Sequence, residues 1–384
     1  MEQSPPGRPG VPGSAREVAG VFLRLGLVAF GGPAAHVALM REELVRRRAW
    51  VDDRRFLDLV AATNLIPGPN STELAIHLGH DRARWRGLVV AGACFILPAA
   101  FLVAGLAWAY VEYGDTPALT GLLYGVVPVM LAIVAWAVIG LAPTVFSAVR
   151  WVVLAALALT AYLLGVNELV VLFGGGAVAA LMHAAGRLRA DGTAALVAPL
   201  LAAPALGQPD PDRYAQLFWS MLRIGAVLYG SGYVLITFLD GEFVDRLGWI
   251  TTEQLVDAVS VGQVTPGPVF TTATFVGYLV AGWPGAVIAT VAIFLPSFVF
   301  VGLLTRLTGW LRSRPWTAAV LDGLSTAAVA LMVGVFGRLA REGLVDVLTV
   351  ALFAVTLLGL WRTRLNSAWF IAGGAVVGLA TAGW

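Results

Sequence analysis

Lysine is absent from this chain of 384 residues, and charged residues of either sign are scarce. All 25 basic residues are arginine, 23 residues are acidic, and the charged fraction is 12%, whereas about a quarter of the residues of a soluble domain are charged. A formal net charge of +2 is too small to indicate a nucleic acid or another strongly acidic partner. We therefore expect no nucleic-acid binding.

Cysteine and the motifs of enzyme active sites are also scarce. The single cysteine, Cys94, lies in an apolar stretch and can form neither an internal disulfide nor a thiolate metal site. The sequence has no clustered metal ligands and no glycine-rich phosphate loop that ends in lysine. We predict that the protein is not an enzyme and that it carries no cofactor or metal.

Apolar residues dominate the chain instead. They make up 59% of it, the mean hydropathy is +0.82, and apolar stretches of roughly 20 residues recur, which is the length of a helix that crosses the bilayer. The lipid bilayer is therefore the expected surrounding, and the expected fold class is an all-α integral membrane protein. Residues 1–16 are rich in proline and glycine and lack the apolar core of a signal peptide, so we expect a disordered N-terminal tail.

The sequence repeats itself at an offset of 199 residues, which becomes 198 after one gap. A repeat of this length is typical of secondary transporters built from two halves. We assign residues 17–187 to a first transmembrane repeat, 188–212 to a linker, and 213–384 to a second transmembrane repeat. The matched positions include Arg24-Leu25-Gly26 with Arg223-Ile224-Gly225, Trp50 with Trp249, Pro67-Gly68-Pro69 with Pro266-Gly267-Pro268, Trp85 with Trp283, and Gly125 with Gly323.

Arginine placement indicates that the two homologous halves lie inverted in the membrane. Short cytoplasmic loops collect arginine. The loop from Arg41 to Arg55 holds six arginines, whereas the matching stretch from Asp240 to Glu253 holds only Arg246. The three arginines between positions 82 and 86 likewise have no basic counterpart in the second half. We expect an inverted-topology repeat.

A break in each half predicts a helical hairpin that enters the membrane and returns. The apolar segment from Phe56 to Gly79 lies between two arginine-rich loops, so both of its ends should be cytoplasmic. Pro67-Gly68-Pro69 supplies the break, because proline removes backbone donors and glycine permits a tight reversal. The mirror-image hairpin spans Val256 to Tyr278. Irregular backbone at membrane depth has to be buried in protein or line a wet cavity, so these re-entrant hairpins mark the predicted site.

The number of membrane crossings follows from this interpretation. Each half has five transmembrane helices and one re-entrant hairpin, which gives ten spans with both termini outside. Counting the hairpins as full spans gives twelve, and this alternative stays open. An outside tail with Arg8 and Arg16 would run against the positive-inside rule.

Two arginines at equivalent repeat positions are candidates for anion binding. Arg24 and Arg223 each lie several residues inside an apolar helix, where a permanent charge is costly unless it is paired or faces a cavity. They predict a pair of cations that face one shared anion. The alternative is that each side chain extends to the membrane interface.

Polar side chains next to the breaks are the second set of candidates. A half-helix that begins after each break would point backbone N–H groups and its positive dipole end into the site, which favours anions. The alternative is that these polar groups only satisfy the broken backbone. The predicted substrate-binding set comprises Arg24, Arg223, Gly31, Gly32, Asn64, Pro67, Gly68, Pro69, Asn70, Ser71, Thr72, Gln263, Pro266, Gly267, Pro268, Thr271 and Thr272.

Titratable groups near the breaks are candidates for coupling transport to protons. Glu73 is the only acid close to either break, and it either carries the coupling proton or stabilises a helix N-terminus. His36 and His77 titrate near neutral pH, but a lone histidine in a membrane segment is more often structural. Glu43 and Glu242 match across the repeat and are better candidates for gates than for ligands.

The order of these motifs resembles the chromate ion transporter family in its long, two-domain form. In the second half Gly230-Ser231-Gly232 departs from the family's second Gly-Gly-Pro. The motifs that carry the resemblance are Phe30-Gly31-Gly32-Pro33, the arginine-rich loop before Trp50, Asn64-Leu65-Ile66-Pro67-Gly68-Pro69, and Gln263-Val264-Thr265-Pro266-Gly267-Pro268.

The resemblance implies a multi-pass secondary transporter in a bacterial plasma membrane. It implies export of chromate, hence chromate resistance, driven by the membrane potential or the proton motive force. Sulfate has the same shape and charge, so transport of sulfate or another oxyanion stays an alternative, as does a passive anion channel. The sequence also leaves the oligomeric state open, a homodimer included.

Overall fold

The computed structural model describes residues 13–29, 32–63, 66–114, 116–145, 147–191, 212–229, 234–311, 315–363 and 365–381, and within them the secondary structure is entirely helical. Helix α1 begins at Ala15, because the Ser14 hydroxyl caps it by accepting from the Glu17 N–H. The helices of the first half are α1 (Ala15–Val28), α2 (Gly32–Arg41), the π-helical η1 (Glu42–Arg47), α3 (Asp53–Thr63), α4 (Asn70–Tyr113), α5 (Pro117–Val145), α6 (Val149–Leu163) and α7 (Glu168–Asp191).

The second half repeats this order, with one additional short element, η3, before its long helix. Its helices are α8 (Arg213–Val227), α9 (Val234–Leu239), the π-helical η2 (Asp240–Arg246), α10 (Thr252–Val264), the 3-10 turn η3 (Val269–Thr271), α11 (Thr272–Leu311), α12 (Pro315–Gly343), α13 (Val347–Arg362) and α14 (Ser367–Thr381). Even the backbone kinks match: Arg84 in α4 has φ 54° and ψ −143°, and Gly282 in α11 has φ 63° and ψ −152°. The predicted duplication is therefore visible in the backbone itself.

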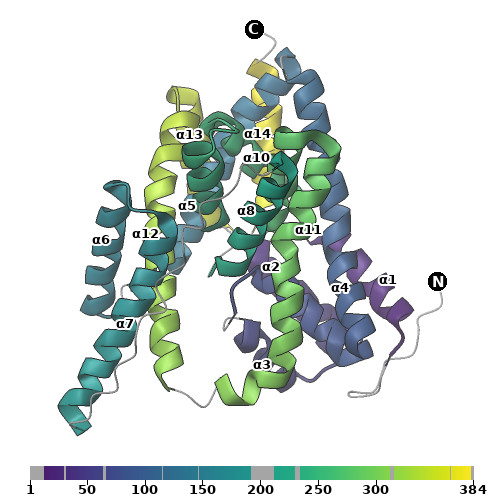
Figure 1. The fold of residues 1–384 in the computed structure, drawn as a ribbon. Coiled ribbons are helices and arrows are strands. Elements are labelled where there is room, and N and C mark those ends of the chain that lie inside the picture. Colours follow the sequence, from purple (N-terminus) through teal and green to yellow (C-terminus); the bar gives the residue numbers. More distant parts are fainter. Residues whose placement is uncertain are drawn as a thin grey trace.

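The two long helices α4 and α11 pack against each other, with α1 on α4 and α8 on α11 (Figure 1). The halves also exchange partners, since α5 packs on α13 and α14, whereas α12 packs on α6 and α7. Within α4, a Cβ on Gly79 would lie 2.4 Å from the Gly87 carbonyl oxygen. Position 79 therefore requires glycine, because the backbone before the kink passes too close to the backbone after it for a side chain to fit.

The two helical hairpins start from opposite ends of the later part of α4, which runs from the kink to Tyr113. Arg55 at the start of α3 forms an ion pair of 2.8 Å with Asp81, just before the α4 kink. Tyr110, near the other end of α4, donates a hydrogen bond of 2.8 Å to Asp257 in α10. We call the end of the molecule at the Arg55–Asp81 ion pair the arginine-rich end. The end at the hydrogen bond between Tyr110 and Asp257 is the opposite end.

The first apolar segment differs from the sequence prediction, which counted it as one of five crossings in its half. The N–H of Gly13 donates to the Arg82 carbonyl at 2.8 Å, and the Trp50 indole donates to Glu17 at 3.1 Å. The segment from α1 to η1 therefore returns to the arginine-rich end where it began. The reason is a break between α1 and α2, where Gly32 has a φ of 79°, so a segment long enough to cross is divided into two short helices.

The predicted position of the two ends of the chain on one side also differs from the structure. Helix α1 begins at the arginine-rich end, whereas α14 finishes at the opposite end, where Gly378 packs on Gly121 near the start of α5. Figure 1 shows the yellow end of α14 near the top of the view and α1, in purple, well below it. The tail prediction for residues 1–16 falls mainly on residues outside the described part, and so does most of the predicted linker 188–212.

Four helical stretches in the described part of the chain are long and apolar enough to cross a membrane. They are Asn70–Tyr113, Pro117–Pro143, Val269–Leu303 and Ala319–Gly343. Four shorter apolar helices accompany them, at Val149–Leu163, Glu168–Ala184, Val347–Arg362 and Ser367–Thr381. Large apolar side chains on their outer faces, such as Phe101 and Val287, are exposed, as expected of surfaces that face lipid.

Candidate functional site

The two Pro-Gly-Pro breaks are joined to the opposite halves by a reciprocal pair of backbone hydrogen bonds. The N–H of Gly68 donates to the carbonyl of Leu228, at the end of α8, at 2.8 Å. The N–H of Gly267 donates to the carbonyl of Ala29, at the end of α1, also at 2.8 Å. Each break therefore lies against a helix end of the other half, and the two halves meet at the predicted site.

Glycine is required at both breaks. Gly68 has a φ of 138° and Gly267 a φ of 107°, which L side chains rarely adopt. A Cβ on Gly267 would also lie 2.7 Å from the Cβ of Ala99 in α4. The flanking prolines supply no N–H, so the helices stop and restart here.

A helix N-terminus follows each break. Helix α4 begins at Asn70, after Pro69, with no side-chain cap. In the second half, η3 begins at Val269, after Pro268, and leads into α11. The N-terminal turns of both helices are buried, so the positive ends of their dipoles face the protein interior.

The hydroxyl groups next to the two breaks are used differently. Thr271 and Thr272 donate to the carbonyls of Pro268 and Val269, each at 2.8 Å, and so satisfy the broken backbone. In the first half the buried Thr72 Oγ1 has no hydrogen-bond partner among the described residues. Gln263 Nε2, before the second break, also lacks one there. The structure therefore leaves polar groups for a ligand from both halves, but from unequal positions.

His36 connects three parts of the site. Its ring lies 1% exposed, with Nε2 at 3.0 Å from the Ala29 carbonyl and Nδ1 at 3.2 Å from the Ser71 hydroxyl. An Nε2–H tautomer donates to Ala29 and accepts from Ser71. The carbonyl oxygen of Ala29 thus accepts hydrogen bonds from both His36 and the Gly267 N–H. Both ring nitrogens of His36 are therefore engaged beside the first break.

Glu73 is the acid of the site. It is 0% exposed, its Oε1 accepts a hydrogen bond of 3.4 Å from Ser297 in α11, and its Oε2 has no partner in the described part of the chain. A Cβ on Gly68 would touch Glu73 Oε1, so the carboxyl group lies directly against the first break. Sequence reasoning missed Ser297, because a serine far along another helix carries no local signal of this contact.

Arg24 and Arg223 are not brought together. Arg24 lies on the exposed side of α1, next to the exposed Leu23 and Leu27. Arg223, whose side chain is 46% exposed, forms an ion pair of 2.5 Å with Glu242 in η2. Gly32 opens α2, whereas the predicted site residues Gly31 and Asn64 lie outside the described residues.

Glu242 and its repeat equivalent Glu43 hold ion-pair networks at opposite ends of the molecule. Glu242 also accepts from Arg246 and Ser220. Burial opposes ionisation of Glu242, but these hydrogen bonds and the charges of Arg223 and Arg246 hold its pKa below the ordinary value. The sequence had suggested gates at these two positions.

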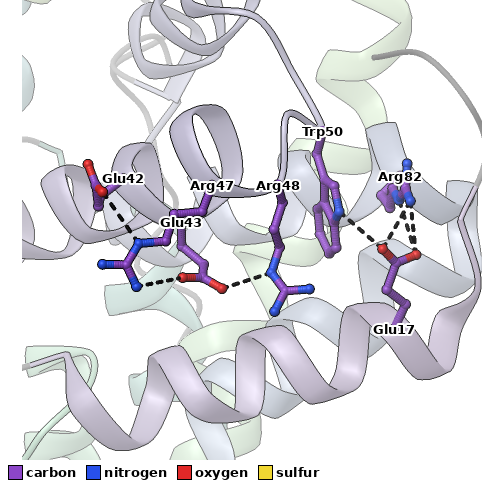
Figure 2. Close-up of polar contacts among 7 residues, drawn as sticks. All are labelled: Glu17, Glu42, Glu43, Arg47, Arg48, Trp50 and Arg82. Atoms are coloured by element: carbon purple, nitrogen blue, oxygen red, sulfur yellow. Dashed lines mark hydrogen bonds and ion pairs between the residues drawn. The ribbon is translucent and has the colours of Figure 1, made fainter. Parts of the chain in front are cut away.

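At the arginine-rich end, Glu43 pairs with Arg48 at 2.8 Å and with Arg47 at 3.8 Å. Figure 2 shows this cluster beside a second one, in which Glu17 lies between Trp50 and Arg82. The Arg82 guanidinium stacks over the Trp50 ring at 5.0 Å. These contacts clamp the start of α1 to the loop after η1 and to the α4 kink.

Comparison with known proteins gives a match in both halves. The model of the family described as "Chromate transporter" matches residues 16–181 and again residues 215–379. A "Chromate transport protein" of Cupriavidus metallidurans is 33% identical over 370 residues, covering 95% of this chain and 92% of that protein. Another, of Pseudomonas aeruginosa, is 35% identical over 368 residues, covering 90% and 87%. No solved structure matches the chain.

Proposed function

Because the chain belongs to the chromate transporter family, a family of transporters and not of enzymes, we propose that it carries chromate across the membrane at the point where its two Pro-Gly-Pro breaks meet. The proposal applies to this chain what the names of its relatives say of them. The protein itself is a multi-pass membrane protein, with long apolar helices in both halves.

One observation carries the location of the site. The reciprocal hydrogen bonds from Gly68 to Leu228 and from Gly267 to Ala29 join the breaks of both halves to one buried centre. Two-half transporters bind substrate near the bilayer midplane, at broken helices whose N-termini point at anionic groups. The buried N-terminal turns of α4 and η3–α11, one after each break, support such a site here. A single shared site is favoured over one site per half.

The chemistry of the centre suits a tetrahedral oxyanion. Unused donors support this, since the Thr72 hydroxyl and the Gln263 amide N–H groups lack protein partners in the described part of the chain. Backbone N–H groups and helix dipoles bind an anion without a fixed cation. Such a site binds loosely enough to release its load, as a carrier requires.

The membrane arrangement follows from the two ends of the molecule. We place the arginine-rich end in the cytoplasm of a bacterium, in its plasma membrane, because short cytoplasmic loops collect arginine. In the described part of the chain each half then has two re-entrant hairpins followed by four crossing helices, and the connection from α7 to α8 lies outside the described residues. The hairpins are α1–η1 with α3–α4 and α8–η2 with α10–α11, and the crossing helices are the later parts of α4 and α11 together with α5, α6, α7, α12, α13 and α14.

Export is the favoured direction. Moving a dianion out of a cell that is negative inside gains about 2.3 kcal/mol per charge for each 100 mV. Glu73 is the proposed coupling group, since a buried carboxyl that changes its charge when the anion binds links proton movement to transport. His36 has both ring nitrogens engaged, so its part is to hold the break in place.

The test also has to distinguish two alternatives to chromate transport by a coupled carrier. Sulfate matches chromate in shape and charge, so the same donors accept both. A passive anion channel would use the same donors without alternating access. Only a coupled carrier moves the anion beyond its electrochemical equilibrium.

The test is transport of labelled chromate by purified protein in proteoliposomes, under an imposed potential and with sulfate as a competitor. Thr72→Val and Gln263→Leu remove the unused donors while keeping the volume, and we expect each to lower the transport rate about tenfold. Thr326→Val is the matched control, because its hydroxyl is buried in α12 and donates to the Asp322 carbonyl. Normal transport by both site variants, or no chromate movement by the wild type, would refute the proposal.

A further inference from the structure

One helix carries a line of titratable groups from the centre of the molecule to its arginine-rich end. Glu73, His77 and Asp81 are spaced four residues apart on the first part of α4, before the kink at Ala83 and Arg84. Residues four apart lie on the same helix face, one turn above the other. Eight residues of α-helix cover about 12 Å. The line therefore reaches from the first break to the base of the hairpin.

The inner two groups are buried and have unused polar atoms. His77 is 3% exposed, and within the described part of the chain neither its Nε2 nor Glu73 Oε2 has a hydrogen-bond partner. The groups that face Glu73 from other parts of the chain are Ser297 in α11 and Tyr229, just after the end of α8. Two titratable groups that each have an unpartnered polar atom on one buried helix face are costly, and such groups in a membrane protein mark ion or proton pathways.

The outer end of the line opens to the surface. Asp81 forms a bidentate pair with Arg55 of α3, with N···O distances of 2.8 and 3.0 Å, and the Arg55 side chain is 51% exposed. The titratable and charged groups that face His77 are Asp81, Arg55 and His80. His80 Nδ1 lies 4.0 Å from Asp81. Water at this end can therefore exchange protons with the line.

The second half has no such line. The equivalent stretch from Val269 to Val280 contains no histidine, aspartate or glutamate, and Val276 and Val280 in it are buried. The rest of the backbone is duplicated closely, down to the kink. The titratable line is thus an addition to one hairpin only, and it leads to one end of the molecule only.

We propose that His77 and Asp81 carry protons between Glu73 and the arginine-rich end, so that the coupling proton enters and leaves on that side alone. This rests on the proposed function, in which Glu73 is the coupling acid. The Asp81 carboxylate takes a proton from a hydronium ion and passes it to one ring nitrogen of His77, and the proton on the other nitrogen passes to the Glu73 carboxylate. The O–H bond at Asp81 breaks as an N–H bond forms at His77, and the second N–H bond of His77 breaks as an O–H bond forms at Glu73, which becomes a carboxylic acid. The reverse sequence releases the proton to the same side.

The test compares two driving forces in proteoliposomes loaded with labelled chromate and a pH-sensitive dye. In the wild type, a pH gradient and an imposed potential each drive chromate, and proton movement accompanies it. We expect His77→Gln to slow pH-driven chromate movement and the accompanying proton flux at least tenfold, while potential-driven movement stays within about threefold of the wild type. Asp81→Asn should give a smaller loss in the same assay.

A matched control is His183→Gln in α7, another histidine with an unpartnered, buried Nε2 among the described residues. In the His183→Gln variant, the pH gradient and the imposed potential should each still drive chromate movement. Equal proton flux in His77→Gln and the wild type would overturn the proton route while leaving chromate transport intact. A wild type that moves no chromate would instead overturn the proposed function and, with it, the route.

Discussion

The N–H of Gly68, at the first Pro-Gly-Pro break, donates to the carbonyl oxygen of Leu228 in the other half of the chain at 2.8 Å. Its repeat equivalent, Gly267, makes the same bond to Ala29. Because Ala29 and Leu228 are themselves 199 residues apart, this one contact occurs twice and ties each hairpin tip to a helix end of the other half. The centre of the molecule is therefore built jointly, and movement of one half past the other has to act on it.

The first prediction concerns these glycines. Gly267→Ala should destabilise the protein by about 1 to 3 kcal/mol, because φ is 107° and a Cβ would lie 2.7 Å from the Ala99 Cβ. Gly20→Ala, in α1 with nothing within 4 Å of its Cβ, is the control and should be neutral or slightly stabilising. Thermal unfolding in detergent measures both. Equal melting temperatures for the two variants would contradict the geometry of the break.

The second prediction concerns the kink of α4. Arg84 has a φ of 54°, which is strained for any residue with a Cβ, and the second half has Gly282 at this position. Arg84→Gly should therefore stabilise the protein by about 1 kcal/mol, and the reverse change Gly282→Arg should destabilise it by a similar amount. The same unfolding assay applies. If both changes shift the melting temperature in the same direction, the two kinks are not equivalent.

The third prediction is a pH dependence. Glu242 is buried, yet its bonds from Arg246 and Ser220 and the charge of Arg223 hold its pKa below the ordinary value of 4.5. A carboxyl whose pKa is lowered by folding stabilises the folded state above its unfolded pKa and loses this contribution as pH falls through the folded pKa. Glu242→Gln should therefore be less stable than the wild type at pH 6 to 7. The difference should shrink as the pH falls below about 4.5, and melting temperatures across this range measure it. A constant difference would exclude the ion pair as its cause.

The fourth prediction separates the two matched arginines. Arg24 is exposed, whereas Arg223 pairs with the buried Glu242. Arg24→Gln should leave chromate transport within about twofold of the wild type. Arg223→Gln should lower stability by about 1 kcal/mol, since Arg246 still pairs with Glu242 and the Arg223 side chain is half exposed. Loss of transport in both variants, with folding intact, would restore the paired-cation site that the sequence suggested.

The duplication and the breaks could be predicted from sequence because their signals are local. Proline and glycine in a Pro-Gly-Pro run determine where a helix stops, and a fixed offset exposes a repeat. Arginine counts predict opposite orientations for the two hairpins from an equally local signal, since each loop carries its own bias. Glu73 was identified as a candidate because it is the only acid near either break.

The return of the first segment could not be predicted in this way. Hydropathy measures the length of an apolar run, and the α1–α2 run is long enough to cross. Its break is marked only by glycine and proline near Gly32, which also suit close helix packing. The ion pair from Arg223 to Glu242 and the contact from Ser297 to Glu73 join residues 19 and 224 positions apart. Contacts over such separations depend on the tertiary fold.

The most direct test of the central claim is to locate the anion itself. A structure of the purified protein in chromate, determined by X-ray diffraction with anomalous data at the chromium edge, shows where the metal atom lies. The account predicts one chromium peak per chain, between the first turns of α4 and α11 and within reach of Thr72 and Gln263. A peak elsewhere, such as beside Arg223 and Glu242, or separate peaks at the two breaks, would contradict a single shared site.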